Sequence, residues 1–295
     1  MDMHISQNAR SKIEKAVVIT GTGRSGTTII GKIIHSFQSV EYVFEPPVLV
    51  TLFSLIDKMP HEQWKLIYET YLYEEILINS ICGRSINCNQ KDDSSIYKVK
   101  LDKEIESRLN RSLRKEDAEH EVKKHNIAYK IPSITHYIPN LLGFYPNSRV
   151  VVVKRDPIGT INSLMHGKWL GDINLKSNNI WPFRIHKGLH VPDYVKESDN
   201  QKWIEMTELD RCAYYYIRIS QGAEKIKNKI EISYDELIDS PSQIIDKIVK
   251  KLNLQYGPKT ESIIKEIKPT RTQRDYSILT KISPALSDLV SYYSG

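Results

Sequence analysis

The chain has 295 residues and a formal net charge of +6, and 40% of its residues are hydrophobic. This length predicts a single α/β domain with a full core, and no apolar run approaches the roughly 20 residues of a membrane span, which predicts a soluble protein. Because its lysines and arginines are spread along the chain, a small anionic ligand is favoured over nucleic acid or a membrane surface.

The polar segment 1–14 predicts a flexible N-terminus without a secretory signal, and therefore a cytoplasmic protein, which we expect to be a monomer or homodimer. The chain has three cysteines, an odd number, and no CxxC pair: Cys82, Cys88 and Cys212. This pattern argues against both a disulfide framework and a zinc site, and no metal is expected.

The first strong pattern joins a β-branched run, 16–20, to helical apolar spacing over 27–37 through a glycine-rich turn. A second apolar run, 40–44, is followed by Glu45 and then by two prolines, which cannot continue a central strand. Glu45 is therefore predicted at the carboxyl end of a strand.

The middle of the chain holds three less regular segments. Residues 61–81 predict a helix with a broad apolar face. Residues 102–125 carry many charges and few apolar anchors, which predicts an exposed helix or a mobile insertion away from the chemistry. Residues 167–200 are rich in Gly, Asn, Pro and Trp and predict a loop or lid, because long irregular segments in compact domains are usually functional or disordered.

The remaining elements alternate between strand and helix. Strands are predicted at 127–131, 149–154 and 230–233, and helices at 134–145, 158–165 and 201–228, with two short helices up to 267. This alternation predicts an open parallel β-sheet with helices on both faces, formed by one domain over 15–295. Ligands of such sheets bind beyond the carboxyl ends of the strands.

The string GTGRSGTT, residues 21–28, has the glycine spacing of a phosphate-binding loop, with Thr27 in the place of that loop's lysine. Its glycines let backbone N–H groups turn inward, and the helix that starts near Gly26 points its positive end at an anion. The remaining donors suit one phosphate with a sulfate attached. The alternative is a glycine turn that serves only strand-to-helix packing.

GTGRSGTT resembles the loop after the first strand of sulfotransferases that use 3′-phosphoadenosine 5′-phosphosulfate (PAPS). The resemblance covers about residues 15–170 and 228–280 and implies their P-loop-like fold. It implies that the 5′-phosphate is bound by Gly23, Arg24, Ser25, Gly26, Thr27 and Thr28. It also places Arg24 to neutralise the bridging oxygen as that oxygen leaves.

The segment VVVVKRDPIGTINSL strengthens the resemblance. Arg155 ends a predicted buried strand, and Ser163 follows eight residues later on the next helix. A guanidinium fork matches phosphate oxygens and a serine hydroxyl adds a neutral donor. Family members use an arginine and a serine at this spacing to contact the 3′-phosphate of PAPS. The alternative is that Arg155 pairs with Asp156 or caps a helix.

Two weaker matches extend the nucleotide site. ISYDELIDSP, residues 232–241, is similar to a family segment whose tyrosine lies near the adenine, which implies this role for Tyr234. KPTRTQRDYS, residues 268–277, lies where many members have a basic loop over the 3′-phosphate, which makes Arg271 and Arg274 candidates. The usual RKG sequence is absent there, and a solvated basic turn is the alternative.

The family's usual base is missing. Cytosolic members use a histidine whose place is taken here by Pro132, although Lys130 matches the lysine of the same segment. Tyrosylprotein sulfotransferases use a glutamate just after the second strand, and Glu45 occupies the equivalent place. The resemblance thus implies Glu45 as general base, with Arg24 and Lys130 stabilising charge and His136 as a weaker alternative base. The alternative is that Glu45 only pairs with Arg24 or caps a helix.

These observations predict a sulfotransferase that moves a sulfuryl group from PAPS to a hydroxyl or amine of a small polar metabolite or natural product, by direct in-line transfer. The product nucleotide is 3′-phosphoadenosine 5′-phosphate (PAP). Two separate anion pockets, after the strands at 16–20 and 149–154, are predicted to hold the two ends of the nucleotide. Residues 48–80 and 167–200 are predicted to shape the acceptor pocket. The alternatives are a P-loop-type small-molecule kinase and a nucleotide-binding relative without catalysis.

Overall fold

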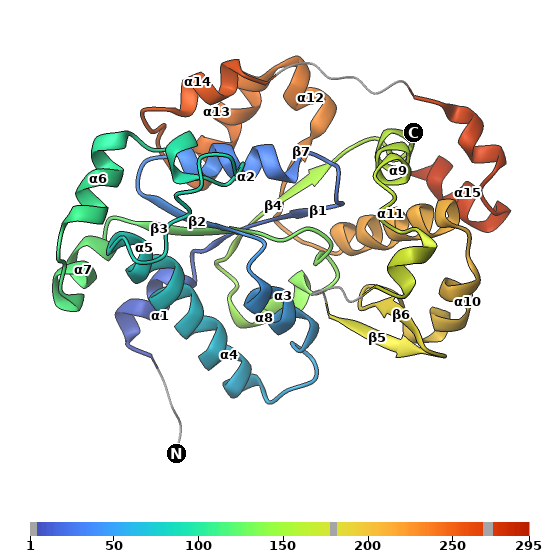
Figure 1. The fold of residues 1–295 in the computed structure, drawn as a ribbon, viewed down its shortest axis with the longest axis horizontal. Helices are drawn as coiled ribbons and strands as arrows, with labels where there is room; N and C mark the ends of the chain where they lie inside the picture. The colour runs from blue at the N-terminus through green and yellow to red at the C-terminus, as the bar shows by residue number, and fades with distance from the viewer. Residues whose placement is uncertain (1–4, 178–181, 268–273, 295) are drawn as a thin grey trace.

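A parallel β-sheet forms the centre of the molecule. The computed structural model describes residues 5–177, 182–267 and 274–294. In these residues a five-stranded sheet has the order β2-β3-β1-β4-β7, and every neighbouring pair is parallel (Figure 1). Its strands are β1 (Val17–Gly21), β2 (Val40–Phe44), β3 (Asn126–Lys130), β4 (Arg149–Lys154) and β7 (Ile230–Ser233). The predicted open parallel sheet is confirmed.

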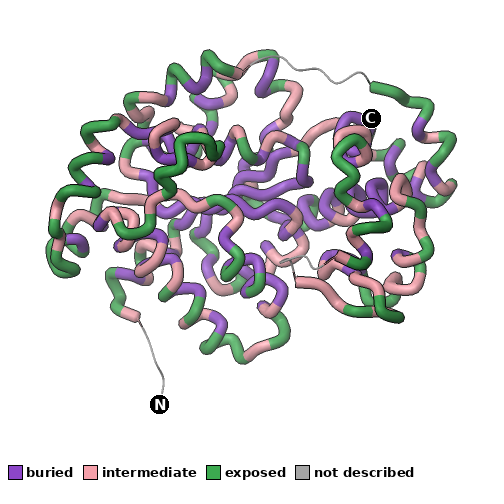
Figure 2. Tube along the Cα trace, in the orientation of Figure 1, coloured by how far each residue is buried: buried purple, intermediate pink, exposed green. Residues whose placement is uncertain are grey.

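Helices cover both faces of the sheet, which explains its unbroken apolar strands. In β1, Val17 and Ile19 pack into one helical layer and Val18 packs into the other, and all five residues are buried (Figure 2). Strands buried on both faces gain from an apolar residue at every position. The layer on the Val17 side contains α2 (Thr27–Ser36), α12 (Tyr234–Asp239), α13 (Pro241–Leu252) and α14 (Thr260–Lys265).

The layer on the opposite face is larger. It contains α1 (Gln7–Ile13), α3 (Pro47–Ser54), α4 (His61–Thr70), the π-helix η1 (Tyr71–Ile78), α5 (Asn79–Ile81), α7 (Lys115–Val122), α8 (Ile138–Phe144) and the end of α11 (Glu208–Glu224). The sequence predicts a flexible terminus over 1–14, whereas α1 packs its buried Ala9 and Ile13 into this layer. Ser6 caps α1 by accepting a hydrogen bond from the N–H of Ala9.

A third apolar cluster lies beside the sheet and is built largely on α11. Its elements are α9 (Pro157–His166), η3 (Asp172–Leu175), β6 (Leu189–Pro192), α10 (Asn200–Glu205), η5 (Tyr276–Thr280) and α15 (Pro284–Tyr292). Strand β6 pairs antiparallel with β5 (Phe183–His186), and the short helix η4 (Glu197–Asp199) precedes α10. Where the sequence predicts an irregular lid over 167–200, the structure therefore contains a β-hairpin and two short helical turns.

Two further predicted helices differ from the structure. The helix expected over 201–228 is divided into α10 and α11, because Thr207 caps α11 by accepting a hydrogen bond from the N–H of Asp210. The helix expected over 61–81 continues from α4 into η1 and α5. None of the helices in the described part of the chain has the length and apolar character needed to cross a bilayer.

The strand register brings the carboxyl ends of the strands side by side. Phe44 at the end of β2 lies beside Lys130 at the end of β3, and Lys154 at the end of β4 lies beside Ser233 at the end of β7. Gly21 at the end of β1 lies beside Val153. The segments that follow the five strands therefore meet at one edge of the sheet.

Candidate active site

The loop between β1 and α2 has a backbone that only its glycines adopt without strain. Gly26 has φ +92°, and a Cβ on it would lie 2.4 Å from Cδ2 of Tyr234. Gly21 has φ +144°, and a Cβ there would lie 2.2 Å from the carbonyl oxygen of Val153. Both positions therefore require glycine, because a side chain would be strained and would also collide with its neighbours. The close approach of Tyr234 also places the first residue of α12 directly against the loop.

The hydroxyl groups of the loop divide into internal and outward-facing groups. The Ser25 hydroxyl is fully buried and lies 2.7 Å from the carbonyl of Thr22 and 3.2 Å from that of Val153. Thr27 is buried as well, whereas Thr28 is exposed. The Ser25 hydroxyl therefore ties the loop to β4, and the backbone N–H of Ser25 donates to the carbonyl of Thr22 at 3.4 Å.

Arg24 links the loop to the segment that follows β4. It is exposed, has φ +67°, and donates a hydrogen bond from Nε to Oγ of Ser163 at 3.0 Å. Its guanidinium carbon lies 5.6 Å from the ring centre of Trp169. Trp169 also lies against Gly23, whose Cβ would be 3.2 Å from the indole ring.

Arg155 joins the same group from the end of β4. It donates a hydrogen bond to the carbonyl oxygen of Arg24 at 2.9 Å, and its guanidinium lies 4.8 Å from the ring centre of Tyr234. The segments that carry the two predicted anion pockets are therefore adjacent, because Arg24 contacts both Ser163 and Arg155. The two pockets themselves stay a prediction.

Glu45 and Lys130 form an ion pair at the ends of β2 and β3. The Lys130 ammonium group donates a hydrogen bond to Oε1 of Glu45 and another, at 3.3 Å, to Oγ1 of Thr28. It also lies 4.1 Å from the ring centre of Phe44. The Lys130 side chain is 3% exposed and the Glu45 side chain 24%. Glu45 is therefore the member of the pair that solvent or an acceptor can reach, and its partner is Lys130, not Arg24.

Burial sets the electrostatics of this pair. Burial lowers the pKa of Lys130, and the nearby Glu45 carboxylate partly offsets that effect. The Glu45 carboxylate therefore favours the charged form of Lys130, which burial disfavours. Glu45 itself has φ +43°, and its N–H donates to the carbonyl of Lys130 at 2.9 Å, which fixes the backbone at the base of the pair.

His136, the alternative base, lies in an unsuitable environment. Burial, together with the positive charge of Arg218, lowers the pKa of His136 to about 3. Its ring packs against Tyr137 at 3.9 Å between centres, and its Nε2 atom is buried without a partner among the described residues. A base with so low a pKa takes a proton poorly. This geometry favours Glu45 over His136.

Of the two basic candidates near the C-terminus, Arg271 lies outside the described residues. Arg274 donates a hydrogen bond to Asp235 at 2.9 Å and its Nε lies 3.4 Å from Asp156. Asp156 caps α9 by accepting from the N–H of Gly159 at 2.7 Å, and Asp235 follows Tyr234. Arg274 therefore bridges the first turns of α9 and α12, beside the position of Arg155.

Tyr215 is a site residue that sequence reasoning misses. Its hydroxyl accepts a hydrogen bond from the N–H of Gly23 at 2.6 Å and shares another with the Ser133 hydroxyl at 2.6 Å. Burial raises the pKa of Tyr215. Tyr215 is one of three consecutive tyrosines on α11, so the sequence alone does not distinguish it from its neighbours.

A cavity of about 440 Å³ lies along the outer strand β2, and one of its lining residues, Phe44, contacts Lys130 of the ion pair. It is bounded by β2, by η1 and by the segment that follows α5. Its lining includes Phe44, Tyr71, Glu75, Ser80, Arg84 and Ser94. The residues of η1 in this lining belong to the segment 48–80 that is predicted to shape the acceptor pocket, and the lining also includes residues from 84–96. No described residue of 167–200 lines this cavity.

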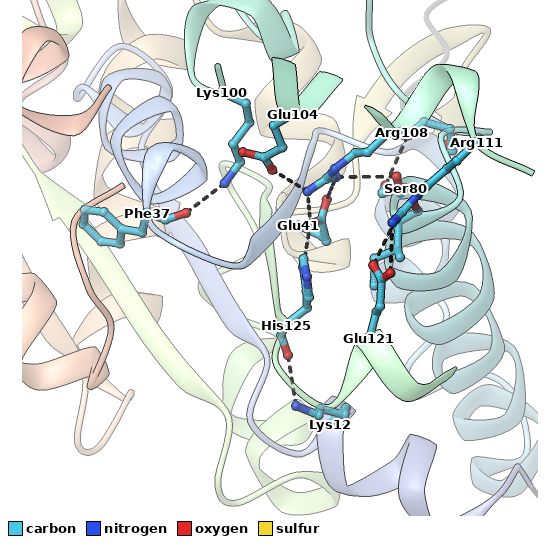
Figure 3. Close-up of polar contacts among 12 residues, drawn as sticks. Lys12, Phe37, Glu41, Ser80, Lys100, Glu104, Arg108, Arg111, Glu121 and His125 are labelled. Carbon is cyan, nitrogen blue, oxygen red and sulfur yellow. Dashed lines mark hydrogen bonds and ion pairs between the residues drawn. The ribbon is translucent and has the colours of Figure 1, made fainter. Parts of the chain in front are cut away.

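A buried charge cluster supports this cavity; we define it as Glu41, Glu104, Arg108 and His125 (Figure 3). Arg108, on α6 (Asp102–Asn110), donates to both carboxylate oxygens of Glu41 at 2.8 and 2.9 Å and to Glu104 at 2.8 Å. His125 bonds Glu41 at 2.8 Å. Residues 102–125 contain two largely exposed helices, and Arg108 anchors the first of them, α6, to β2.

Comparison with known proteins identifies the class to which this site belongs. The model of the sulfotransferase family matches residues 16–258. No curated protein matches the chain. Among solved structures, the sulfotransferase STF9 from Mycobacterium avium is similar, with 12% identity and a TM-score of 0.46 over 95% of this chain and 76% of that one.

Two more solved structures are similar to this chain. The sulfotransferase domain of the curacin biosynthetic pathway has 12% identity and a TM-score of 0.46, over 95% of this chain and 97% of that one. The sulfotransferase STF1 from Mycobacterium tuberculosis H37Rv has 12% identity and a TM-score of 0.41, over 98% and 81%. The family match spans most of the chain, and the protein therefore belongs to the sulfotransferase family. Membership in this family implies PAPS as the sulfuryl donor.

Proposed function

We propose that the protein transfers a sulfuryl group from PAPS to a hydroxyl or amine of a small polar metabolite or natural product. The acceptor oxygen or nitrogen forms a bond to sulfur while the bond from sulfur to the 5′-phosphate oxygen breaks. The electron pair of the broken bond stays on that oxygen, and the acceptor's proton passes to Glu45. The transfer is direct, so no covalent enzyme intermediate forms.

The single observation that carries this proposal is the contact among Arg24, Ser163 and Arg155. Two guanidinium groups and a hydroxyl lie together at the start of α2 and the end of β4. Guanidinium groups bind phosphate oxygens through paired donors, and the start of a helix adds its positive end. These groups fit a nucleotide with a phosphate at each end, and the Tyr234 ring beside Arg155 offers a face for its base.

Within this proposal Lys130 and Glu45 act at the reacting centre. The Lys130 ammonium group lies between the loop, through Thr28, and the carboxylate of Glu45. We assign Lys130 and Arg24 to the negative charge that develops on the sulfonate and the leaving phosphate. Glu45 is reachable from solvent and is assigned to the proton of the acceptor.

We also propose that the protein acts in the cytoplasm. Its cysteines are all free thiols, two of them buried and one exposed. Thiols persist in a reducing compartment, whereas secreted proteins usually pair them. Fractionation of the producing cell tests this location.

Calorimetric titration tests the nucleotide site. PAP should bind, and ATP with magnesium should bind far more weakly. Because a hydrogen bond to a charged group contributes about 1.5 to 3 kcal/mol, Arg155→Ala should weaken PAP binding about tenfold or more. Arg114→Ala is the matched control, since Arg114 is exposed and its ion-pair partner among the described residues is Asp117 on α7. Unchanged PAP affinity in Arg155→Ala would remove the 3′-phosphate assignment, and preference for ATP would favour a kinase.

Transfer itself is tested with labelled PAPS and a panel of hydroxylated and aminated metabolites. Label should appear in at least one acceptor with release of PAP. Binding of PAP without transfer to any acceptor would instead identify a nucleotide-binding relative that has lost catalysis.

A further inference from the structure

The cavity beside β2 contains a carboxylate whose charge no described residue neutralises. Glu75 accepts one hydrogen bond from the side-chain amide of Asn79 and one from the hydroxyl of Ser85, each at 2.8 Å. Both donors are neutral, and no ion pair joins Glu75 to any lysine, arginine or histidine of the described chain. The carboxylate group is therefore held in the cavity wall by two neutral donors.

The other acidic group of the cavity wall is already neutralised. Glu41 lines the same cavity but is bonded on both oxygens by Arg108 and on one by His125. Burial, with the charge of Lys100, lowers the pKa of His35 in the wall to about 3, so this ring is uncharged at neutral pH. Glu75 is thus the carboxylate of the wall that is open to a cation.

The helix that carries Glu75 is unusual. Residues 71–78 form the π-helix η1, and Tyr71, Glu75 and Ile76 all line the cavity. Tyr71 lies about one turn before Glu75 and Ile76, so the three residues share a face of the helix. Extended π-helical segments are rare and occur frequently at functional sites. Burial and the neighbouring Glu75 raise the pKa of Tyr71 to about 12, so it offers a neutral aromatic ring beside the carboxylate.

The cavity approaches the proposed reacting centre through Phe44. Phe44 lines the cavity, its ring contacts the Lys130 ammonium group at 4.1 Å, and Glu45 follows it in the chain. A ligand that spans the cavity from Glu75 to Phe44 would therefore approach the Lys130 and Glu45 pair. A volume of about 440 Å³ is within the range of sites for small organic molecules.

We propose that this cavity binds the acceptor and selects a hydroxylated amine, whose ammonium group pairs with Glu75 and whose hydroxyl group accepts the sulfuryl group. The inference rests on the proposed function and narrows it to transfer onto oxygen, because the amine is protonated and held away from Glu45. The acceptor hydroxyl loses its proton to Glu45 as its oxygen bonds to sulfur, and the electron pair of the broken bond remains on PAP.

Binding without PAPS tests the cavity independently of catalysis. The probes are two matched pairs, D-glucosamine against D-glucose and tyramine against 4-ethylphenol, followed by ligand-observed NMR at a pH where the amines are protonated. At least one amine should bind the wild-type protein about tenfold or more tightly than its neutral partner, and Glu75→Gln should abolish that preference. Equal binding within both pairs, or a preference that survives in Glu75→Gln, overturns the proposal.

Two control variants separate the charge of Glu75 from general effects. Glu74→Gln makes the same chemical change one residue earlier, where the carboxylate pairs with Lys115 outside the cavity, and should leave the preference unchanged. Arg84→Gln removes the positive charge of the cavity wall and should leave amine binding equal or tighter. Glu75→Asp keeps the charge and should restore part of the preference. Loss of the preference in Glu74→Gln, or weaker amine binding in Arg84→Gln, counts against the proposal.

A transfer assay distinguishes failure of the proposed sulfuryl transfer from failure of the amine site. If amines bind through Glu75 but no label passes from PAPS to any acceptor, the proposed function fails while the amine site stands. If label passes equally to the amines and to their neutral partners, the proposed function stands and the amine site is refuted.

Discussion

Replacing Arg108 with alanine should destabilise the protein strongly. The Arg108 side chain is 6% exposed and the Glu41 side chain that it bonds is 2% exposed. The substitution removes both of these hydrogen bonds and the third to Glu104, and leaves the buried carboxylate with His125 as its partner. Removal of one partner from a buried ion pair costs about 3–5 kcal/mol. The free energy of unfolding should fall by about that amount, which is a large part of the 5–15 kcal/mol typical of a domain.

Urea unfolding followed by circular dichroism measures this loss. With a slope near 3 kcal/mol/M, the unfolding midpoint should fall by about 1 M or more. Arg114→Ala, which breaks an exposed pair with Asp117, should cost at most about 0.5 kcal/mol. A loss below about 1 kcal/mol in Arg108→Ala would mean that Glu41 is solvated or protonated, and would refute the placement of α6 against β2.

Three further predictions concern the base, the loop and acid stability. Glu45→Gln should lower kcat about 10²- to 10⁴-fold with little change in PAP affinity; a fully active variant would exclude Glu45 as the base. Gly26→Ala should lose about 1–3 kcal/mol of stability in urea and weaken PAP binding, because φ +92° and the Tyr234 ring both oppose a side chain. Gly143→Ala should cause neither the loss of stability nor the weaker PAP binding, because a Cβ there would have no neighbour within 4 Å. Equal effects of the two substitutions would contradict this explanation. Burial opposes ionisation of Glu41, but Arg108 and His125 outweigh it and hold its pKa well below the usual range. Its stabilising contribution is therefore complete above about pH 4.3 and is lost as the pH falls below that value, so wild-type stability should drop more steeply between pH 5 and 3 than that of Arg108→Ala.

The sequence predicts the sheet well because local pattern and tertiary environment agree there. The strands β2, β4 and β7 have their predicted bounds, since runs such as RVVVVK are apolar at every buried position. The meeting of Arg24, Arg155 and Tyr234 also follows from strand order, because each comes at or just after the end of a parallel strand. The bounds of these strands therefore place the site.

Other features depend on contacts that no local pattern contains. In the sequence, nothing distinguishes Arg108 from the other charged residues of its segment. In the fold, it bonds Glu41 on β2, which is 67 residues away in the chain. Tyr215 is selected from three tyrosines only by the position of Gly23. The π-helix that carries Glu75 likewise has no signature in its apolar spacing. These residues become functional candidates only when distant elements pack together.

The position of Glu41 also affects how the chain avoids association with other copies while it folds. In the described part of the chain, β2 is an outermost strand of the sheet, and such strands can recruit a strand from another molecule. Until α6 docks, Glu41 is a charged side chain within that strand, which disfavours pairing with an apolar partner. Once Arg108 is in place, the same charge holds the helix that lies beside the strand. One carboxylate thus opposes aggregation before folding is complete and stabilises the native packing afterwards.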